Sequence, residues 1–205
     1  MLVKICGLLE PADAHVAVAA GADMVSVIFA PARRRRTLAQ ALAIFDAAPP
    51  HVERVGVFVD APQAEVNEVI DICRLDRVQL SGAETPAYAR AFGERAVKTL
   101  RLPNDVGEFP RFSVSLFHLD ALVDGQAGGT GESWDYSLAR DATHTYRVLL
   151  SGGLTPDNVA SAIHATRPYG VDVSSGVETS RRKDHDKIEQ FIRNARRAFA
   201  AAAVP

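Results

Sequence analysis

Eight short apolar segments recur along the 205-residue chain, and most are followed by a stretch long enough to form a helix. The segments predicted to be strands are residues 3–6, 24–29, 54–60, 77–80, 96–102, 114–120, 146–150 and 169–173. Helices are expected to begin near residues 10, 38, 62, 85, 155 and 184, with a weaker helical connection at 104–109. Strands that alternate with helices in this way form parallel βα units. Two architectures satisfy the pattern, a closed eight-stranded barrel and an open doubly wound sheet.

The glycines favour the barrel. An open dinucleotide-binding sheet usually carries a G-x-G-x-x-G sequence after its first strand, whereas Gly7 stands alone there. Small residues instead follow the last two predicted strands, at 151–153 and 174–176. We therefore predict an α/β fold, a single (β/α)8 TIM barrel that occupies residues 1–205 as one domain.

The same two small-residue turns predict a phosphate site. A (β/α)8 barrel often binds phosphate with the loops after strands seven and eight, where glycines let backbone N–H groups approach the oxygens. The alternative is that both segments are only tight turns. The predicted phosphate-binding residues are Gly152, Gly153, Ser174, Ser175 and Gly176.

Composition excludes several classes of protein. The chain is 47% hydrophobic and 23% charged with a formal net charge of -2, so no basic excess points to nucleic acid. It has no apolar run long enough to span a membrane, and its N-terminal residues form a strand pattern unlike a signal peptide. Two cysteines, Cys6 and Cys73, give no disulfide framework. We expect a cytoplasmic protein that binds a small molecule, with no nucleic-acid or membrane partner.

The first predicted strand carries an unusual pair of side chains. Because side chains alternate between the two faces of a strand, Lys4 and Cys6 share one face, while Val3 and Ile5 share the other. The ammonium group lies two strand rises, about 7 Å, from the thiol, and its charge favours the thiolate. The alternative is that Cys6 is a small buried hydrophobe, as most free cysteines are.

A carboxylate ends the sixth predicted strand. Asp120 lies on the same face as His118, and in a barrel it shares the mouth with Cys6. One group can then serve as a general acid and the other as a general base. A helix cap or a surface acid is the ordinary alternative for Asp120. The glycine cluster at 128–131 is expected to form a loop that covers the substrate.

The order and spacing of short motifs along the whole chain are highly specific. The motifs are KICG at 4–7, RVGVFV at 54–59, VQL at 78–80, LD at 119–120, GGTG at 128–131, WD at 134–135, LSGGL at 150–154, PDNV at 156–159 and VDVSSGVE at 171–178. With them the chain resembles the phosphoribosylanthranilate isomerases of tryptophan biosynthesis. The resemblance implies a (β/α)8 barrel that converts N-(5-phosphoribosyl)anthranilate to 1-(2-carboxyphenylamino)-1-deoxyribulose 5-phosphate by an Amadori rearrangement. It also implies that no metal or organic cofactor is used.

The resemblance assigns roles to individual residues. Cys6 is implied to be the general base that removes the proton from ribose C2, and Asp120 the general acid that protonates the ring oxygen. The arginine that pairs with the anthranilate carboxylate lies within 33–36, with Arg34 favoured and Arg35 next. Further substrate-binding residues implied by the resemblance are Gln79, Gly129 and Asp172.

Some positions depart from the family pattern, and these bear on how anthranilate is bound. Ser81 stands where the family commonly has histidine, Ser26 where it has glycine, and the sequence WDY at 134–136 replaces FDW. The competing functions are a histidine-pathway aminoaldose isomerase, a metal-dependent ribulose-phosphate epimerase and a non-catalytic phosphate-binding barrel. The first should have an aspartate in place of Cys6, the second several histidines at strand ends, and the third needs neither Cys6 nor Asp120. Sequence leaves a monomer and a homodimer equally open.

Overall fold

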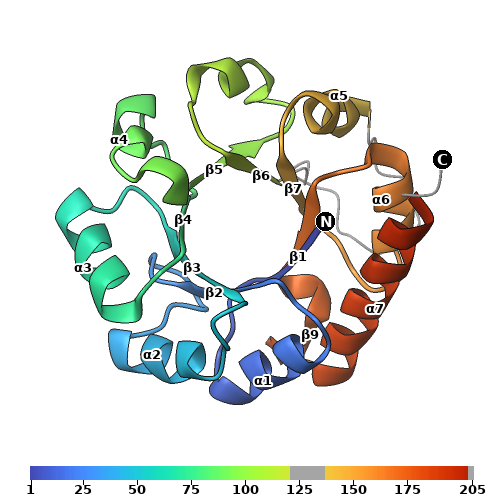
Figure 1. The fold of residues 1–205 in the computed structure, drawn as a ribbon, viewed down its shortest axis with the longest axis horizontal. Coiled ribbons are helices and arrows are strands. Elements are labelled where there is room, and N and C mark those ends of the chain that lie inside the picture. Colours follow the sequence, from blue (N-terminus) through green and yellow to red (C-terminus); the bar gives the residue numbers. More distant parts are fainter. Residues whose placement is uncertain (121–136, 203–205) are drawn as a thin grey trace.

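Eight parallel strands close into a barrel in the order β1 to β8 (Figure 1). The computed structural model describes residues 1–120 and 137–202. The barrel strands are β1 (Leu2–Ile5), β2 (Met24–Ile28), β3 (Glu53–Phe58), β4 (Arg77–Leu80), β5 (Ala96–Arg101), β6 (Leu116–Asp120), β7 (Val148–Ser151) and β8 (Gly170–Val173). The (β/α)8 barrel predicted from the sequence is therefore confirmed, and the open sheet is excluded.

Helices form a ring around the barrel (Figure 1). They are α1 (Pro11–Ala19), α2 (Leu38–Asp46), α3 (Gln63–Cys73), α4 (Pro86–Arg90), α5 (Ser137–Thr145), α6 (Val159–Thr166) and α7 (His185–Ala202), with short 3-10 turns η1 (Gly93–Arg95), η2 (Val106–Arg111) and η3 (Ser175–Val177). A two-stranded antiparallel hairpin, β9 (Glu178–Thr179) and β10 (Arg182–Lys183), follows η3. The sequence pattern predicted neither α5 nor this hairpin.

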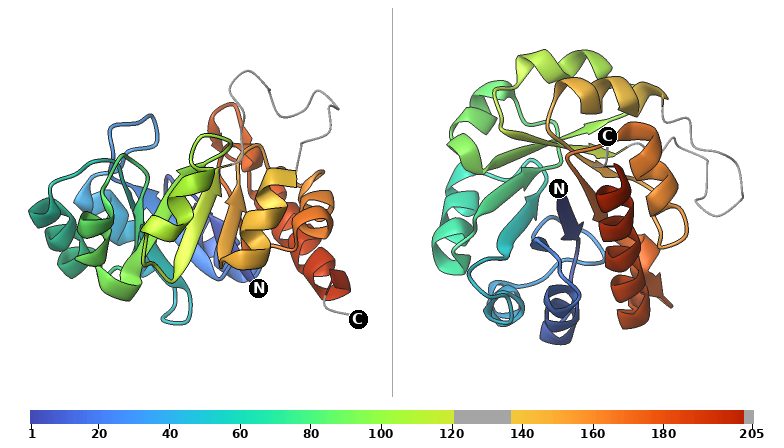
Figure 2. Two further views of the ribbon diagram at one scale, coloured as in Figure 1. Left: turned by 90° about the horizontal axis from the view of Figure 1, so that it is seen from above. Right: turned by 45° about the vertical axis from the view of Figure 1, so that its right-hand side comes forward.

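The two ends of the barrel differ. The N terminus and the end of α7 lie toward one end, while the loop after β2 and the segment after β8 rise at the opposite end (Figure 2). Because all eight strands are parallel, this opposite end is where their C-terminal residues meet, which is where (β/α)8 barrels carry their active sites.

Two hydrophobic clusters hold the fold together. The larger one includes Val3 and Ile5 and fills the space between the strands and the surrounding helices. The smaller one is contributed by alternate residues of the barrel strands: Met24, Val55, Val97, Leu116 and Leu149. The strand face opposite Val3 and Ile5 carries Lys4, whose side chain is fully buried. Lys4 therefore faces the barrel interior, as the alternation of side chains predicted.

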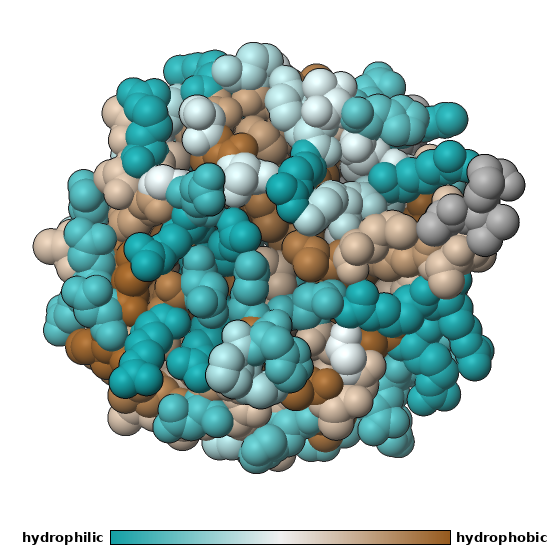
Figure 3. Space-filling view, viewed as in Figure 1, coloured by the Kyte–Doolittle hydropathy of each residue, from teal (hydrophilic) through white to brown (hydrophobic). Residues whose placement is uncertain are grey.

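The outer surface is mixed in character. In the end-on view of Figure 3, hydrophilic residues lie around the ring of helices with smaller hydrophobic areas between them. Within the described part of the chain, no helix is both long and apolar enough to cross a membrane.

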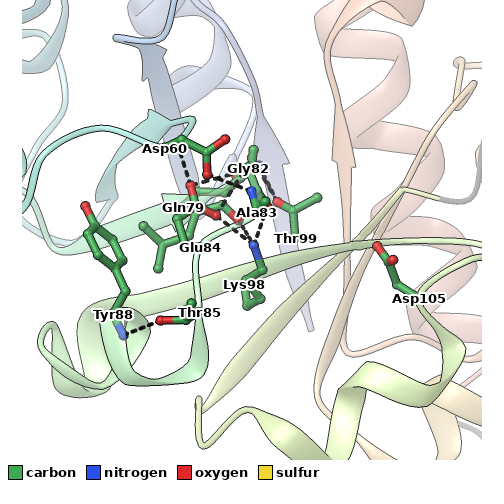
Figure 4. Close-up of polar contacts among 12 residues, drawn as sticks. Asp60, Gln79, Gly82, Ala83, Glu84, Thr85, Tyr88, Lys98, Thr99 and Asp105 are labelled. Carbon is green, nitrogen blue, oxygen red and sulfur yellow. Dashed lines mark hydrogen bonds and ion pairs between the residues drawn. The ribbon is translucent and has the colours of Figure 1, made fainter.

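A buried ion pair fixes the loop between β4 and α4. Lys98 Nζ lies 2.7 Å from Glu84 Oε2 and donates to the carbonyl oxygen of Gly82 at 2.6 Å (Figure 4). The Glu84 carboxylate also accepts the backbone N–H groups of Asp60 and Gly82. The two charged side chains are 4% and 2% exposed, so both have lost most of their hydration. Each charge is compensated by the other.

Removing this ammonium should destabilise the protein strongly. We expect Lys98→Met to lower the free energy of unfolding by about 3–5 kcal/mol, because Glu84 would remain buried without its cation. Arg111→Met is the matched control, since Arg111 pairs with Glu108 on the surface, and there the loss should stay below about 1 kcal/mol. Urea denaturation of both variants measures the difference, and equal losses would contradict this account of the loop.

Candidate active site

The predicted acid and base lie at the same end of the barrel. Cys6 directly follows β1 and is buried, and Asp120 is the last residue of β6 and is half-buried. The register places Ser151 of β7 beside Asp120. The structure therefore brings Cys6 and Asp120 to one mouth, on strands separated by β7 and β8.

A buried charged triad lies one layer below. Asp172 of β8 contacts Lys4 Nζ at 3.0 Å through Oδ1 and His118 Nε2 at 2.8 Å through Oδ2. Lys4 is two residues before Cys6 on one strand, and His118 is two residues before Asp120 on another. One carboxylate thus connects the strands that carry the thiol and the acid.

The charge state of the triad follows from its pairing. Burial by itself raises the pKa of Asp172, but Lys4 and His118 outweigh it and hold that pKa below its ordinary value. Burial likewise lowers the pKa of Lys4, while Asp172 and Cys6 act against it, and the net pKa of Lys4 is raised. An ionised carboxylate only accepts hydrogen bonds, so Nε2 of His118 carries the hydrogen in its bond to Asp172.

Gln79 belongs to a network of hydroxyl groups. Its Nε2 donates to Ser81 Oγ at 3.2 Å and to Thr99 Oγ1 at 3.4 Å, and the two hydroxyls are 2.9 Å apart. Ser81 is the position where the family commonly has histidine, and here it completes this network. Within the described residues, the buried side-chain atoms without a hydrogen-bond partner are Gln79 Oε1, His118 Nδ1, Lys4 Nζ and Asp172 Oδ1, of which the last two form the ion pair.

Arg34 is the arginine of the 33–36 loop that lies over the end of β1. A Cβ atom at Gly7 would sit 2.9 Å from Cδ of Arg34, and Gly7 has φ +67°, a conformation that favours glycine. Arg34 Nε contacts Glu178 at 2.5 Å, which leaves the two terminal nitrogens of its guanidinium outside this ion pair. The glycine of the KICG motif therefore makes room for an arginine beside the thiol.

Glu178 gathers three cations. Besides Arg34, its carboxylate contacts Arg33 at 2.6 Å and Lys183 at 3.4 Å. Burial by itself raises the pKa of Glu178, but these neighbours, Arg34 foremost, lower it to about 2. Neither Glu178 nor Lys183 was singled out from the sequence, because the hairpin that brings them together has strands of only two residues.

The other two arginines of the loop lie elsewhere. Arg35 is exposed, its backbone pairs with Ile28 at the end of β2, and it lines a cavity of about 400 Å³ with Phe29, Glu65 and Val69. Arg36 Nε donates to the carbonyl oxygen of Leu9 at 3.0 Å. The structure therefore places Arg34 over the end of β1 and Arg35 beside the end of β2.

The two loops predicted to bind phosphate are packed against each other. Gly152 and Gly153 have φ values of 91° and 62°, and a Cβ atom at Gly176 would lie 1.8 Å from the carbonyl oxygen of Leu154. Asn158 braces the first loop by donating to the carbonyl oxygen of Gly153 at 2.9 Å. The φ values favour glycine at 152 and 153, and a side chain has no room at 176, so the close approach of the loops depends directly on the sequence.

The neighbouring serines differ in their contacts. Ser174 Oγ donates to the carbonyl oxygen of Cys6 at 3.2 Å, which ties the second loop to the end of β1, and Ser175 begins η3. Gly129 and the glycine cluster at 128–131 lie outside the described residues. No group of three or more metal-ligating side chains occurs in residues 1–120 and 137–202.

The fold and the site define a (β/α)8-barrel protein with a thiol, a carboxylate and several cations at its C-terminal mouth. A sequence model of N-(5'-phosphoribosyl)anthranilate (PRA) isomerase matches residues 3–194. The chain belongs to the N-(5'-phosphoribosyl)anthranilate isomerase family.

Relatives of this name are similar over nearly their full lengths. The protein from Trichlorobacter lovleyi is 45% identical, covering 96% of this chain and 98% of its own, and that from Desulforudis audaxviator is 44% identical, covering 97% and 99%. The crystal structure of phosphoribosyl anthranilate isomerase from Thermotoga maritima superposes with a TM-score of 0.84 at 38% identity, covering 96% of this chain and 99% of that one. A second such isomerase structure, 36% identical with a TM-score of 0.83, contains reduced 1-(o-carboxyphenylamino)-1-deoxyribulose 5-phosphate.

A carboxylate in the glycine loop should abolish anion binding if the paired loops hold phosphate. Inorganic phosphate at ten times its dissociation constant should stabilise the native protein by about 1.4 kcal/mol and raise its Tm. We expect Gly153→Asp to lose this rise, because the new charge would repel the anion. Gly93→Asp is the control, since Gly93 has a similar φ of 55° with nothing within 4 Å of its Cβ position. An unchanged rise in Gly153→Asp would remove the phosphate site from these loops.

Proposed function

We propose that this protein catalyses the Amadori rearrangement of N-(5-phosphoribosyl)anthranilate to 1-(2-carboxyphenylamino)-1-deoxyribulose 5-phosphate, as an aldose–ketose isomerase of tryptophan biosynthesis. The proposal rests on the placement of Cys6 and Asp120 at one mouth of the barrel, above the triad of Lys4, Asp172 and His118. The chain also belongs to this isomerase family. The related structure that contains a reduced form of the product supports the choice of substrate.

The reaction needs one proton delivered and one removed. Asp120 would protonate the ring oxygen, which opens the furanose and leaves an iminium at C1. The iminium is an electron sink that acidifies the C2–H bond, so the thiolate of Cys6 is a sufficient base. Loss of the C2 proton gives an enolamine, which tautomerises to the ketone. The overall change is an isomerisation with no external oxidant or reductant.

The substrate's two anionic ends would be bound at separate places. We assign the anthranilate carboxylate to the terminal guanidinium nitrogens of Arg34, which the pair with Glu178 does not use. The phosphate is assigned to the N–H groups of the loops after β7 and β8. Gln79 would contact the substrate from the floor of the mouth, and Asp172 would act from below by holding Lys4 and His118.

Residues 1–205 would act as one catalytic domain in the cytoplasm without a metal or organic cofactor. A related structure from Thermotoga maritima is described as mutually generated monomers of a dimeric phosphoribosylanthranilate isomerase. All residues assigned here come from one chain, so the proposed site can work in a monomer or a homodimer.

A different aminoaldose isomerase is the nearest competitor, and Cys6 argues against it because that activity is expected to use an aspartate at this strand end. A non-catalytic phosphate binder would need neither the thiol nor the acid. The purified protein should abolish the anthranilate fluorescence of the substrate over time. Stable fluorescence with saturating protein would refute the proposed activity.

Replacing the acid or the base should stop catalysis without unfolding the barrel. We expect Cys6→Ser and Asp120→Asn each to lower kcat by roughly 10²–10⁴-fold, because a hydroxyl is a poor base and an amide has no proton to give. The fluorescence assay measures the rate, and circular dichroism checks the fold. With both groups acting in one turnover, kcat/KM should be bell-shaped in pH. A Cys6→Ser enzyme with near-native kcat would remove the thiol from the mechanism.

Replacing the binding arginine should mainly affect KM. We expect Arg34→Ala to raise KM by the loss of a charged hydrogen bond of about 1.5–3 kcal/mol, which is roughly 10–100-fold. Arg35→Ala is the matched control, since Arg35 lies in the same loop but faces a different cavity. Steady-state kinetics on both variants give the comparison. A large effect of Arg35→Ala with none for Arg34→Ala would reverse the assignment.

A further inference from the structure

Lys183 is a buried cation that the mechanism above does not use. Its side chain has no solvent-exposed area, although it belongs to the two-residue strand β10. Nζ donates to the carbonyl oxygen of Ser174 at 2.8 Å and lies 3.4 Å from Glu178. Burying an ammonium group is costly unless its charge is compensated, so its place beside the mouth requires a reason.

The compensation from Glu178 is shared. Arg33 and Arg34 contact the same carboxylate at 2.6 and 2.5 Å, closer than Lys183 does. Three cations therefore surround one anion, and Lys183 is the most distant of them. The carbonyl oxygen of Ser174 offers only a dipole. Positive charge at Lys183 is thus incompletely matched by this cluster.

The Cys6 thiol is the nearby group that can supply the missing negative charge. Ser174 joins the two residues, because its carbonyl accepts from Lys183 and its hydroxyl donates to the carbonyl oxygen of Cys6. Burial lowers the pKa of Lys183, Cys6 and Glu178 act to raise it, and the result is a lowered pKa. Ser174 thus joins a partly matched ammonium group to the backbone of Cys6, and the charge of the Cys6 thiol acts on Lys183.

The other charged groups around Cys6 are already engaged or more remote. Lys4, directly below it on β1, is paired with Asp172 at 3.0 Å. Arg34, over the end of β1, is paired with Glu178. The full set that faces this mouth from the surrounding elements is Lys4, His118, Asp120, Asp172, Arg33, Arg34, Glu178 and Lys183.

We propose that Lys183 is a positioning residue for the reaction, whose ammonium group stabilises the thiolate of Cys6. The β9–β10 hairpin then positions the ammonium group of Lys183. Glu178 neutralises this group only in part, because its carboxylate also pairs with Arg33 and Arg34. The inference rests on the proposed role of Cys6 as the base. It adds a second cation to Lys4, from a different element of the fold.

The reactivity of the thiol tests the proposal without any substrate. In a Cys73→Ala background, the rate of alkylation of Cys6 by iodoacetamide is measured across pH for the parent protein and for Lys183→Met, Lys183→Gln and Lys183→Arg. Loss of the charge in Met or Gln should move the alkylation curve to higher pH and slow the reaction about tenfold near neutrality. Arginine should largely restore the curve.

Two comparisons separate charge from structure. Glutamine keeps a donor for the carbonyl oxygen of Ser174, so a purely structural role predicts that Lys183→Gln alkylates as the parent does. Lys187→Met is the matched control, because Lys187 braces the same hairpin by donating to the carbonyl oxygen of Glu178 at 3.1 Å and to Thr179 Oγ1 at 2.9 Å. Its alkylation curve should not move. A parent-like curve for Lys183→Gln, or an equal shift for Lys187→Met, would overturn the proposal.

Failure of this inference and failure of the proposed function give different results. If Cys6→Ser keeps its activity, the thiol is not the base, whatever the alkylation curves show. If Cys6→Ser is inactive but charge loss at Lys183 leaves alkylation unchanged, the proposed function stands and Lys183 has no part in preparing the thiolate.

Discussion

The ion pair between Lys4 and Asp172, extended to His118, is the interaction on which the rest of the site depends. Three ionisable side chains from β1, β6 and β8 fill part of the barrel interior, where an apolar layer would be simpler to bury. Asp172 contacts both Lys4 and His118, so one carboxylate joins the strands whose ends carry Cys6 and Asp120. The cost of burying charge is thus offset within the layer directly below the mouth.

Glycine sets the shape of the mouth above this layer. At Gly7 the missing side chain lets Arg34 cross the end of β1, and at Gly176 it lets the second loop touch the first. Cations then collect around Glu178, which brings the loop after β2 and the hairpin after β8 together. The result is a mouth with a surplus of positive charge, suited to a substrate that carries a carboxylate and a phosphate.

The sequence predicted the barrel and the layout of its mouth because both follow from local patterns. The strand at 77–80 has the predicted ends, and the alternation in β1 correctly placed Lys4 and Cys6 on the inner face. What it could not predict depends on contacts distant in sequence. The contacts of Arg34 with Gly7 and Glu178 join segments far apart in the chain, and Lys183 enters only through a two-residue strand.

The proposed reaction requires Cys6 to remove the C2 proton of a phosphoribosylated aromatic amine. A substrate deuterated at ribose C2, followed by mass spectrometry in ordinary water, tests this claim most directly. We expect the ketose product to lose the label to solvent, and we expect the deuterium to slow a single turnover of the protein that retains Cys6. A product that keeps all of the deuterium at C1 and forms with no isotope effect would show that the C2 hydrogen never exchanges with solvent through a protein base. That result would contradict the proposed role of Cys6.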